Sequence, residues 1–447
     1  MKVYFDTLGC MKNFDDTDMA KGILGKSGHE IAETPEDADV IIVNTCGFIE
    51  AAKKESIDEV FRMAEYKKQG KKLLVSGCLA QRYAKDLSDE MSEADGFLGV
   101  NDYDKLPEIL DNIANGDRPV EDDEYDSSRD TMLTGDSERY IPEGTYSTYL
   151  RISEGCDRNC SYCIIPKIRG PYRSKSEESI IKEAERLAAH GCKELVVIAE
   201  DTGCYGIDLY GEPRLAELLR KLCRVDDIMW IRVMYCYEDH ITDELIDAIA
   251  EEDKMCKYID IPLQHASDRI LKAMRRKTTL LSIREKLAKL HERIPDIAIR
   301  TTFITGFPGE TDEDSAILED FVEEQKFARV GVFTFSAEEG TAAYDMPDQI
   351  PEEIKEERRD AVMLKQLGIS LEHNRSMIGH TYEVIVDEID EDGSYIGRTR
   401  FDAPDIDNSV LFTSDREHEP GDIVNVHIED AFDYDLTGRE VYDESAE

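Results

Sequence analysis

Three cysteines lie close together in the segment 155–173, which reads GCDRNCSYCIIPKIRGPYR. Cys156, Cys160 and Cys163 have the spacing C-x3-C-x2-C, in an expected loop after a strand-like run at 147–153. Three thiolates this close can hold three irons of a cubane 4Fe–4S cluster, while the fourth iron has no cysteine within local reach. Zinc is a weaker alternative, because structural zinc usually takes four ligands from C-x2-C pairs. The spacing therefore predicts a cluster with one open iron.

Three more cysteines occupy one position in a repeat of strands and helices. Cys10, Cys46 and Cys78 each follow an expected strand, and each has a neighbouring glycine. The carboxyl ends of parallel strands lie along one edge of a sheet, where ligands bind, so these cysteines can converge. A single cysteine there is more simply a small buried residue, but three in register predict a second 4Fe–4S cluster, again with an open iron. The other cysteines share no spacing and are interpreted as packing residues: Cys192, Cys204, Cys223, Cys236 and Cys256.

Residues 1–116 alternate between strand-like and helix-like segments, which predicts a doubly wound parallel α/β domain. We expect its first helix over 15–28. The expected strands are 2–7, 37–44, 72–76 and 96–100. Residues 117–140 are acidic, rich in serine and aspartate and without periodicity, which predicts a linker.

Residues 141–375 continue the alternation on a larger scale, and six βα units predict a partial (β/α) barrel. In such barrels the chemistry collects in the loops after the strands, and the cysteine motif follows the first strand. The loop after the fifth strand reads TGFPGET; Gly306 permits close approach of a ligand, and Glu310 can accept hydrogen bonds from an amine or a ribose. The expected strands are 147–153, 194–199, 229–235, 258–262, 297–304 and 330–335.

Residues 379–447 switch to short alternating strands separated by glycine and aspartate turns, which predicts a small antiparallel β-barrel. The expected strands are 381–387, 395–400, 410–413 and 423–428. This tail contains 21 acidic residues and 4 basic ones, a composition poorly suited to binding phosphate.

The charge of the whole chain also indicates the kind of partner. Its 447 residues include 99 acids and 54 bases, a formal charge of −45. This balance argues mildly against RNA and for a basic protein partner, although an organism with acidic proteins throughout would give the same balance. An odd cysteine count, 11, without a small-domain pattern indicates metal chemistry in a reducing compartment, and we expect the cytoplasm and no membrane span.

Together these motifs resemble the radical-SAM methylthiotransferases over essentially the whole chain. The similar segments are TLGC-x2-N, NTCGFI, SGCLAQRY, EGCDRNCSYCIIPKIRG, DIPLQHAS and GFPGET. The resemblance implies that Cys156, Cys160 and Cys163 hold the cluster that cleaves S-adenosylmethionine (SAM), with Tyr162, Gly306 and Glu310 near the cofactor. It implies that the other three cysteines hold an auxiliary cluster that manages the inserted sulfur, and that the tail is a TRAM domain. No side-chain acid or base is expected beyond the clusters.

Within the family, DIPLQHASDRIL, EDTGCYG and FDAPDIDNSVLF are most similar to the members that methylthiolate the β-carbon of an aspartate in the small-subunit ribosomal protein S-twelve. An electron donor is a second implied partner. Relatives that modify adenosines in tRNA share the domains and the six cysteines, so tRNA is the alternative substrate, which the acidic tail disfavours. A non-enzymatic iron–sulfur or zinc protein is the distant alternative.

Overall fold

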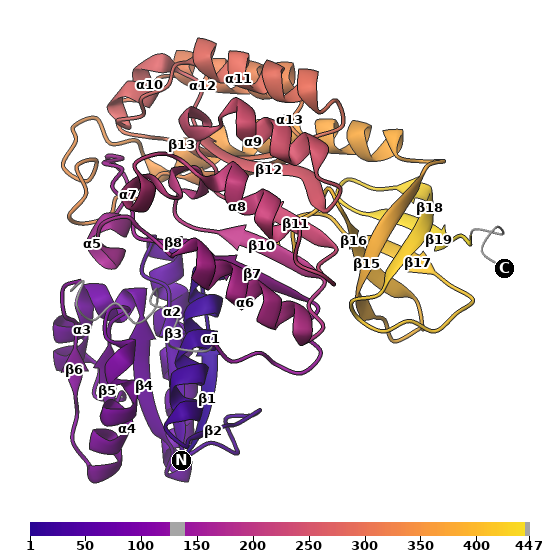
Figure 1. The fold of residues 1–447 in the computed structure, drawn as a ribbon. Helices are drawn as coiled ribbons and strands as arrows, with labels where there is room; N and C mark the ends of the chain where they lie inside the picture. Colours follow the sequence, from indigo (N-terminus) through magenta and orange to yellow (C-terminus); the bar gives the residue numbers. More distant parts are fainter. Residues whose placement is uncertain (126–138, 443–447) are drawn as a thin grey trace.

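The computed structural model describes residues 1–125 and 139–442, which form three consecutive domains (Figure 1). The N-terminal domain lies below the central domain in this view, and the C-terminal barrel lies beside the central domain. The predicted linker 117–140 falls mostly on residues outside the described ranges. Its start is not without structure, because Val120–Glu121 forms strand β6 and extends the edge of the first sheet by pairing with β5 (Gly96–Leu98). Two residues are too few to leave a sequence pattern.

The N-terminal domain contains one fully parallel sheet of six strands in the order β2-β1-β3-β4-β5-β6. Continuous apolar strands predict burial on both faces, and separate hydrophobic clusters do cover the two faces. The remaining strands are β1 (Lys2–Thr7), β2 (Glu30–Ile31), β3 (Val40–Thr45) and β4 (Lys72–Gly77). The helices are α1 (Met11–Lys26), α2 (Glu50–Ala64), α3 (Cys78–Glu90) and α4 (Leu106–Asn115), with the 3-10 turns Glu65–Gln69 and Tyr103–Lys105.

Helix α1 begins earlier than the sequence predicts. It starts at Met11, with Cys10 as its N-cap, whereas the expected start was residue 15. The first turn carries Lys12 and Asn13, and these polar side chains are buried. Sequence periodicity missed this turn because its buried side chains are polar: Asn13 donates to the Leu8 and Thr45 carbonyls, and Lys12 donates to the Ala199 carbonyl of the central domain. The earlier start places Cys10 and Lys12 on a fixed element rather than on a loop.

The central domain is an open parallel sheet of six strands in the order β14-β13-β12-β11-β10-β7, as expected for a partial barrel. The strands are β7 (Ser147–Arg151), β10 (Glu194–Ile198), β11 (Trp230–Val233), β12 (Met255–Gln264), β13 (Ala298–Thr305) and β14 (Arg329–Thr334). The longer helices are α6 (Glu177–Ala189), α8 (Leu215–Leu222), α9 (Asp243–Glu251), α11 (Leu280–Arg293), α12 (Asp312–Gln325) and α13 (Glu352–Ser376). Shorter elements are β8 (Ser153–Glu154), α5 (Ile165–Arg169), β9 (Arg173–Ser174), α7 (Ile207–Tyr210) and α10 (Asp268–Ala273).

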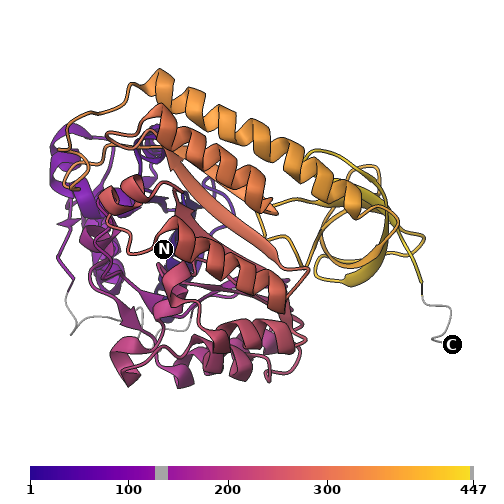
Figure 2. The same ribbon diagram turned by 90° about the horizontal axis from the view of Figure 1, so that it is seen from above.

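The two faces of the central sheet have different neighbours. One face packs on the domain's own helices, which follow one another along one side of the sheet in Figure 2. The other face packs on Met11 of α1 and on Ile385 and Ala403 of the C-terminal barrel. Both flanking domains therefore share a hydrophobic core with the central sheet, which fixes their positions.

The C-terminal domain is a closed barrel of five strands in the order β15-β16-β17-β19-β18. Four pairings are antiparallel, and β17 pairs with β19 in parallel. The sequence did not predict β19, because LTGRE lacks a clear alternation, but this strand closes the barrel. The strands are β15 (Thr381–Ile389), β16 (Tyr395–Thr399), β17 (Val410–Thr413), β18 (Ile423–Ala431) and β19 (Leu436–Glu440).

Buried ion pairs connect the barrel to the central domain. Glu194 of β10 lies 3.1 Å from Arg232 and 2.9 Å from Arg398 of β16. Burial raises the pKa of Glu194, but the two guanidinium groups outweigh it and lower that pKa to about 2. The barrel is therefore fixed on the central sheet by charge as well as by apolar contact. None of the helices in the two described ranges is both long enough and apolar enough to cross a membrane.

Candidate active site

The first three cysteines lie at the carboxyl ends of three adjacent strands, as the repeat predicted. Strands β1, β3 and β4 are neighbours, and Thr45 at the end of β3 pairs with Gly77 at the end of β4. Cys46 and Cys78 are the next residues after this pair, and Cys10 lies three residues beyond the end of β1. We call Cys10, Cys46 and Cys78 the N-terminal triad.

Glycines beside the N-terminal triad allow its segments to approach closely. A Cβ added at Gly9 would lie 2.7 Å from Cys46 Cβ, and one added at Gly47 would lie 2.8 Å from the backbone of Cys78. Real side chains do not tolerate such distances, so the three segments meet only because these residues are glycines. The backbone contacts support convergence of the three thiols.

Replacing Gly77 by alanine should destabilise the N-terminal domain more than replacing Gly116. Both have positive φ, 94° and 93°. Gly77 has ψ −159°, which is nearly restricted to glycine, and an added Cβ would lie 2.3 Å from Asn44 Oδ1. Gly116 has ψ 8°, and an added Cβ meets nothing within 4 Å. We expect the free energy of unfolding to fall by roughly 3 kcal/mol for Gly77→Ala and by about 1 kcal/mol for Gly116→Ala. Urea unfolding measures this free energy, and the iron content of each variant is measured beside it. Equal losses would contradict this geometry.

The surroundings of the N-terminal triad act on the pKa of its thiols in opposite directions. Burial raises the pKa of Cys46 to about 11 and that of Cys78 to about 12. The Arg169 guanidinium lies 3.5 Å from Cys78 Sγ and opposes this shift. Cys10 and Cys78 lie at the N-terminal ends of α1 and α3, where the helix dipole also favours thiolates. Burial outweighs these opposing influences at Cys46 and Cys78, so these two thiols would become anions only when a metal ion takes the place of the proton; Cys10 is exposed.

The second group of cysteines lies on the loop after β8, at the carboxyl end of the first strand of the central sheet. We call Cys156, Cys160 and Cys163 the central triad. The loop is tightly held: the Cys156 N–H donates to the Gly170 carbonyl at 3.1 Å, and the Cys163 N–H donates to the Cys160 carbonyl at 3.1 Å. The Arg158 N–H donates to Cys156 Sγ at 3.4 Å. Three thiols held by their own backbone fit the three-iron ligation predicted from the spacing.

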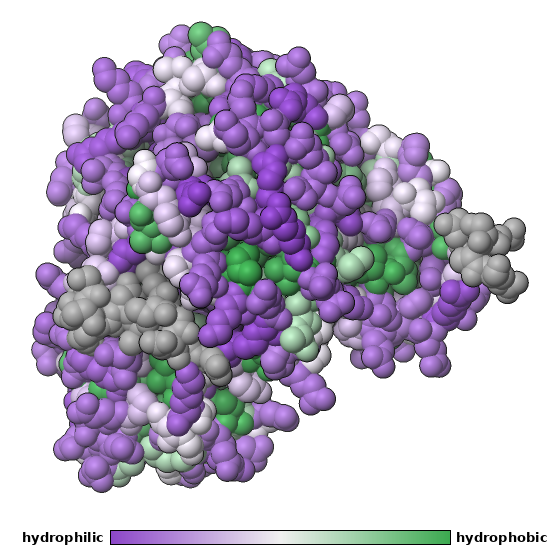
Figure 3. All heavy atoms as spheres, viewed as in Figure 1, coloured by the Kyte–Doolittle hydropathy of each residue, from purple (hydrophilic) through white to green (hydrophobic). Residues whose placement is uncertain are grey.

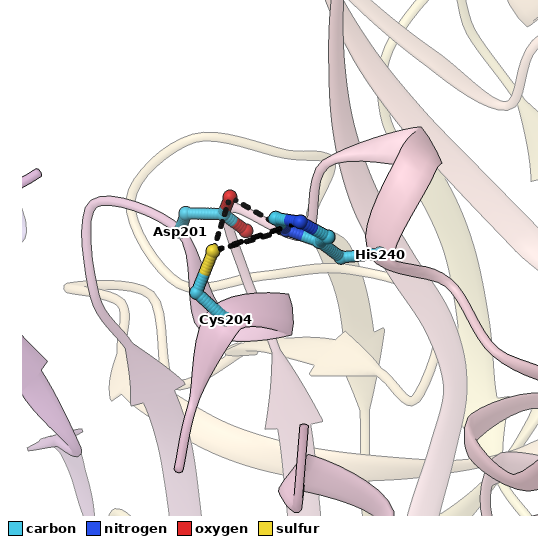
Figure 4. A group of neighbouring side chains, drawn as sticks. All are labelled: Asp201, Cys204 and His240. Atoms are coloured by element: carbon cyan, nitrogen blue, oxygen red, sulfur yellow. Dashed lines mark hydrogen bonds and ion pairs between the residues drawn. The ribbon is translucent and has the colours of Figure 1, made fainter. Parts of the chain in front are cut away.

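A cluster of polar side chains anchors this loop to the next two strands. Asp201 Oδ2, Cys204 Sγ and His240 Nδ1 lie within 3.0–3.1 Å of one another (Figure 4). Their types could hold a metal ion, but Arg158 Nε lies 2.7 Å from Asp201 Oδ2 and Arg158 Nη2 lies 2.9 Å from His240 Nδ1. The guanidinium already supplies the positive charge, so the cluster positions Arg158 beside Cys156. Cys204 is therefore not the packing residue that the sequence suggested, whereas Cys192, Cys223, Cys236 and Cys256 are buried.

The three residues predicted to lie near the cofactor have different surroundings. Tyr162 packs among apolar side chains, and its buried hydroxyl has no hydrogen-bond partner among the described residues. Gly306 has φ 72°, and an added Cβ would lie 2.1 Å from Lys355 Cγ, so α13 requires this glycine. The Glu310 carboxylate is fully buried, accepts from the Phe307 N–H at 3.1 Å and pairs with Arg358 at 3.1 Å. These contacts favour structural roles for Gly306 and Glu310; their contacts with SAM stay a prediction.

Arg169 connects the segment that follows the central triad to the N-terminal triad. It is the last residue of α5, six positions beyond Cys163, and its Nη2 lies 3.5 Å from Cys78 Sγ and 2.7 Å from Asp16 Oδ2. Arg151 of β7 lies 2.7 Å from the other oxygen of Asp16. All these groups except the sulfur are charged and buried, and a buried charge is stable only when it is paired. The pairing therefore fixes the central loop against the N-terminal triad.

Lys12 lies in the same seam, the contact region between the N-terminal and central domains. The sequence did not predict a role for it. Burial opposes its charge, but Glu200, Cys10 and Tyr235 outweigh it and raise the pKa of Lys12. Burial raises the pKa of Cys163 to about 12, and the Lys12 ammonium acts in the opposite direction. One ammonium group is thus within electrostatic reach of both triads. The signal in the sequence was the polar pair Lys12 and Asn13, which follow Cys10 on a helix with few apolar residues.

Models of known families match each of the three domains. The uncharacterized protein family UPF0004 matches residues 2–99, the radical SAM superfamily matches 150–321 and the TRAM domain matches 378–441. In fold, the chain is similar to TsrM from Kitasatospora setae, described as a radical S-adenosylmethionine methyltransferase, with a TM-score of 0.56 over 74% of each chain at 15% identity. The cobalamin-dependent radical enzyme OxsB matches 82% of this chain and 56% of its own, with a TM-score of 0.50.

Full-length relatives are much more similar in sequence. The proteins called "Ribosomal protein uS12 methylthiotransferase RimO" from Clostridioides difficile and Lachnoclostridium phytofermentans are 49% and 47% identical to this chain. The first match covers 99% of both chains, and the second covers 98% of this chain and 99% of the relative. The same protein from Acetivibrio thermocellus is 46% identical over 100% of this chain and 99% of its own. With its three domains and two cysteine triads, the chain therefore belongs to the RimO family of radical-SAM methylthiotransferases.

Proposed function

We propose that this chain transfers a methylthio group to ribosomal protein uS12, at the β-carbon of an aspartate, using SAM and two 4Fe–4S clusters. The observation that carries the proposal is the contact of Arg169 with Cys78, which joins the loop of the central triad to the N-terminal triad. Two cysteine triads held against each other can serve one substrate atom. Identities of 45–49% with uS12 methylthiotransferases over nearly the whole chain support the same reaction.

The protein's part in the reaction is to hold the clusters, to orient the loops that carry the cysteines and to shield the site from water. The central triad would hold the cluster that binds SAM, and the N-terminal triad would hold the auxiliary cluster. When bound, these groups supply the radical that takes a hydrogen atom from an unactivated C–H bond and the sulfur that replaces it. Partly buried Tyr162 stands in the loop of the central triad, and Arg158 and Arg169 orient the cysteine loops. No side chain of ordinary pKa could deprotonate that carbon, so no acid or base is assigned.

The charge of the barrel supports a basic protein as substrate. From Gly379 onward the chain has 21 acids and 4 bases. Three of those bases are already paired: Arg398 with Asp387 at 2.8 Å, Arg400 with Glu383 at 2.8 Å and Arg439 with Glu429 at 3.9 Å. The face of the molecule in Figure 3 is largely hydrophilic, with small separate apolar areas. An acidic, hydrophilic surface attracts a cationic ribosomal protein and repels the phosphates of tRNA, so we infer that tRNA is not the substrate.

Location and the second partner follow from the chemistry. All eleven cysteines are free, which agrees with a reducing compartment, and we place the protein in the cytoplasm, where ribosomal proteins are made. A one-electron donor is required for reductive cleavage of SAM and is the second proposed partner. We infer no association with a membrane.

A parallel assay with two substrates tests the proposal. The protein is reconstituted anaerobically with iron and sulfide, supplied with SAM and a reductant, and offered uS12 or unmodified tRNA. Mass spectrometry should find a methylthio group on an aspartate of uS12 and an unchanged tRNA. A methylthio group on a tRNA adenosine would overturn the choice of substrate while preserving the fold and the triads.

A further inference from the structure

The space between the two triads contains a lysine whose bonding is incomplete. Lys12 extends from the first turn of α1 to the carboxyl end of the central sheet, with a side chain that is 10% exposed. Its Nζ lies 3.1 Å from the Ala199 carbonyl oxygen, 3.6 Å from Glu200 Oε1 and 4.6 Å from the centre of the Tyr235 ring. An ammonium group has three N–H donors. Among the described residues, only the Ala199 oxygen is within hydrogen-bond distance of it.

The hydrogen bonding of Glu200 is incomplete in the same way. Its side chain is 5% exposed, and neither carboxylate oxygen has a hydrogen-bond partner in the described part of the chain. A buried ion pair is costly unless hydrogen bonds complete it on both sides. The distance of 3.6 Å leaves the donors of Lys12 and the acceptors of Glu200 available to groups that enter from outside. Buried polar groups are normally hydrogen-bonded, so a group from outside this chain, whether water, an ion or a ligand, is needed to complete this pair.

The backbone at Tyr235 also indicates a site built for binding. Tyr235 has φ 54°, a left-handed conformation that is rare for a bulky residue. The residue follows β11, and this conformation accompanies the placement of its ring beneath the Lys12 ammonium. Strained conformations of this kind persist where the surrounding structure holds a side chain in a required position.

We propose that Lys12 binds the side-chain carboxylate of the substrate aspartate and thereby selects aspartate over its uncharged amide, asparagine. This inference rests on the proposed function and names the residue that recognises its target. The β-carbon is bonded directly to the carboxyl carbon, so a carboxylate held at Nζ places the reacting carbon in the seam between the triads. A carboxylate that leaves water needs a partner of opposite charge, and Lys12 offers donors that no described group accepts.

The alternative is a purely structural ion pair between Lys12 and Glu200. The two roles predict different results for substitution of each partner. If the pair is structural, Lys12→Met and Glu200→Gln break the same contact and have the same effect. If Lys12 binds the substrate, Lys12→Met removes the cation, whereas Glu200→Gln removes only the competing carboxylate and leaves the cation in place.

The test compares two forms of uS12, one with the natural aspartate and one with asparagine at that position. The dissociation constant of each form is measured with the reconstituted full-length protein. The unmodified protein should bind the aspartate form about 10-fold or more tightly, since a charge-assisted hydrogen bond is lost with asparagine. Lys12→Met should bind both forms equally. Lys54→Met, the same change at an exposed position of α2, should keep the preference.

Iron content is measured in each variant, because Lys12 is two residues from Cys10. A Lys12→Met protein with normal iron that still prefers aspartate would overturn the inference. If Lys12→Met does not load iron, the Glu200→Gln variant provides the test instead. This variant should keep or increase the preference for the aspartate form of uS12. Loss of that preference at normal iron content would overturn the inference. Failure of the unmodified protein to methylthiolate uS12 would instead refute the proposed function, which separates the two outcomes.

Discussion

Replacement of Cys160 by alanine should abolish the cleavage of SAM. Cys160 is the middle residue of the central triad, is 9% exposed, and is joined to Cys163 by a backbone hydrogen bond of 3.1 Å. Two remaining thiolates leave one of the three irons without its cysteine ligand. We expect a loss of more than about 100-fold, since even weakening the outer shell of a metal site costs 10- to 100-fold. The rate of SAM cleavage is measured as the amount of 5′-deoxyadenosine formed under reduction.

The matched control for Cys160→Ala is Cys223→Ala. Cys223 is also 9% exposed, but it packs in the hydrophobic core of the central domain. Its replacement creates a small cavity and should cost about 1 kcal/mol of stability while leaving the cleavage of SAM unchanged. Normal cleavage by Cys160→Ala would refute the assignment of the central triad.

Replacement of Cys46 by alanine should separate the two halves of the reaction. Cys46 belongs to the N-terminal triad and lies on a different domain from the residues that hold SAM in the proposal. We therefore expect SAM cleavage to continue, and methylthiolation of uS12 to fall below detection, at least about 100-fold. The two products, 5′-deoxyadenosine and methylthiolated uS12, are measured in the same reaction, together with iron per chain.

Cys192→Ala is the control for this variant. Cys192 is fully buried in the central domain and donates to the Glu194 carbonyl at 3.1 Å. Its loss should leave both products and the iron content unchanged. Detection of methylthiolated uS12 with Cys46→Ala would show that the N-terminal triad does not manage the sulfur.

The sequence was sufficient for the parts of the site that depend on local pattern and strand order. Cys10, Cys46 and Cys78 could be placed together because each follows a strand, and parallel strands end at one edge. The central triad could be recognised because its three ligands lie within eight residues. The five-stranded barrel was incomplete in the prediction, because β19 carries a pattern too weak to recognise and acquires its role by closing the sheet.

What the sequence by itself determined is therefore the domain architecture, the two triads and the family. What only the tertiary structure decided is how side chains of one domain reach the segments that carry the triads. Arg169 contacts Cys78 across 91 positions of the chain, and Lys12 reaches Ala199 across 187. Such contacts leave no periodic signal, because they depend on how two sheets pack and not on the order of residues within either. The buried charges in that seam are stable only because the folded domains bring their partners to them.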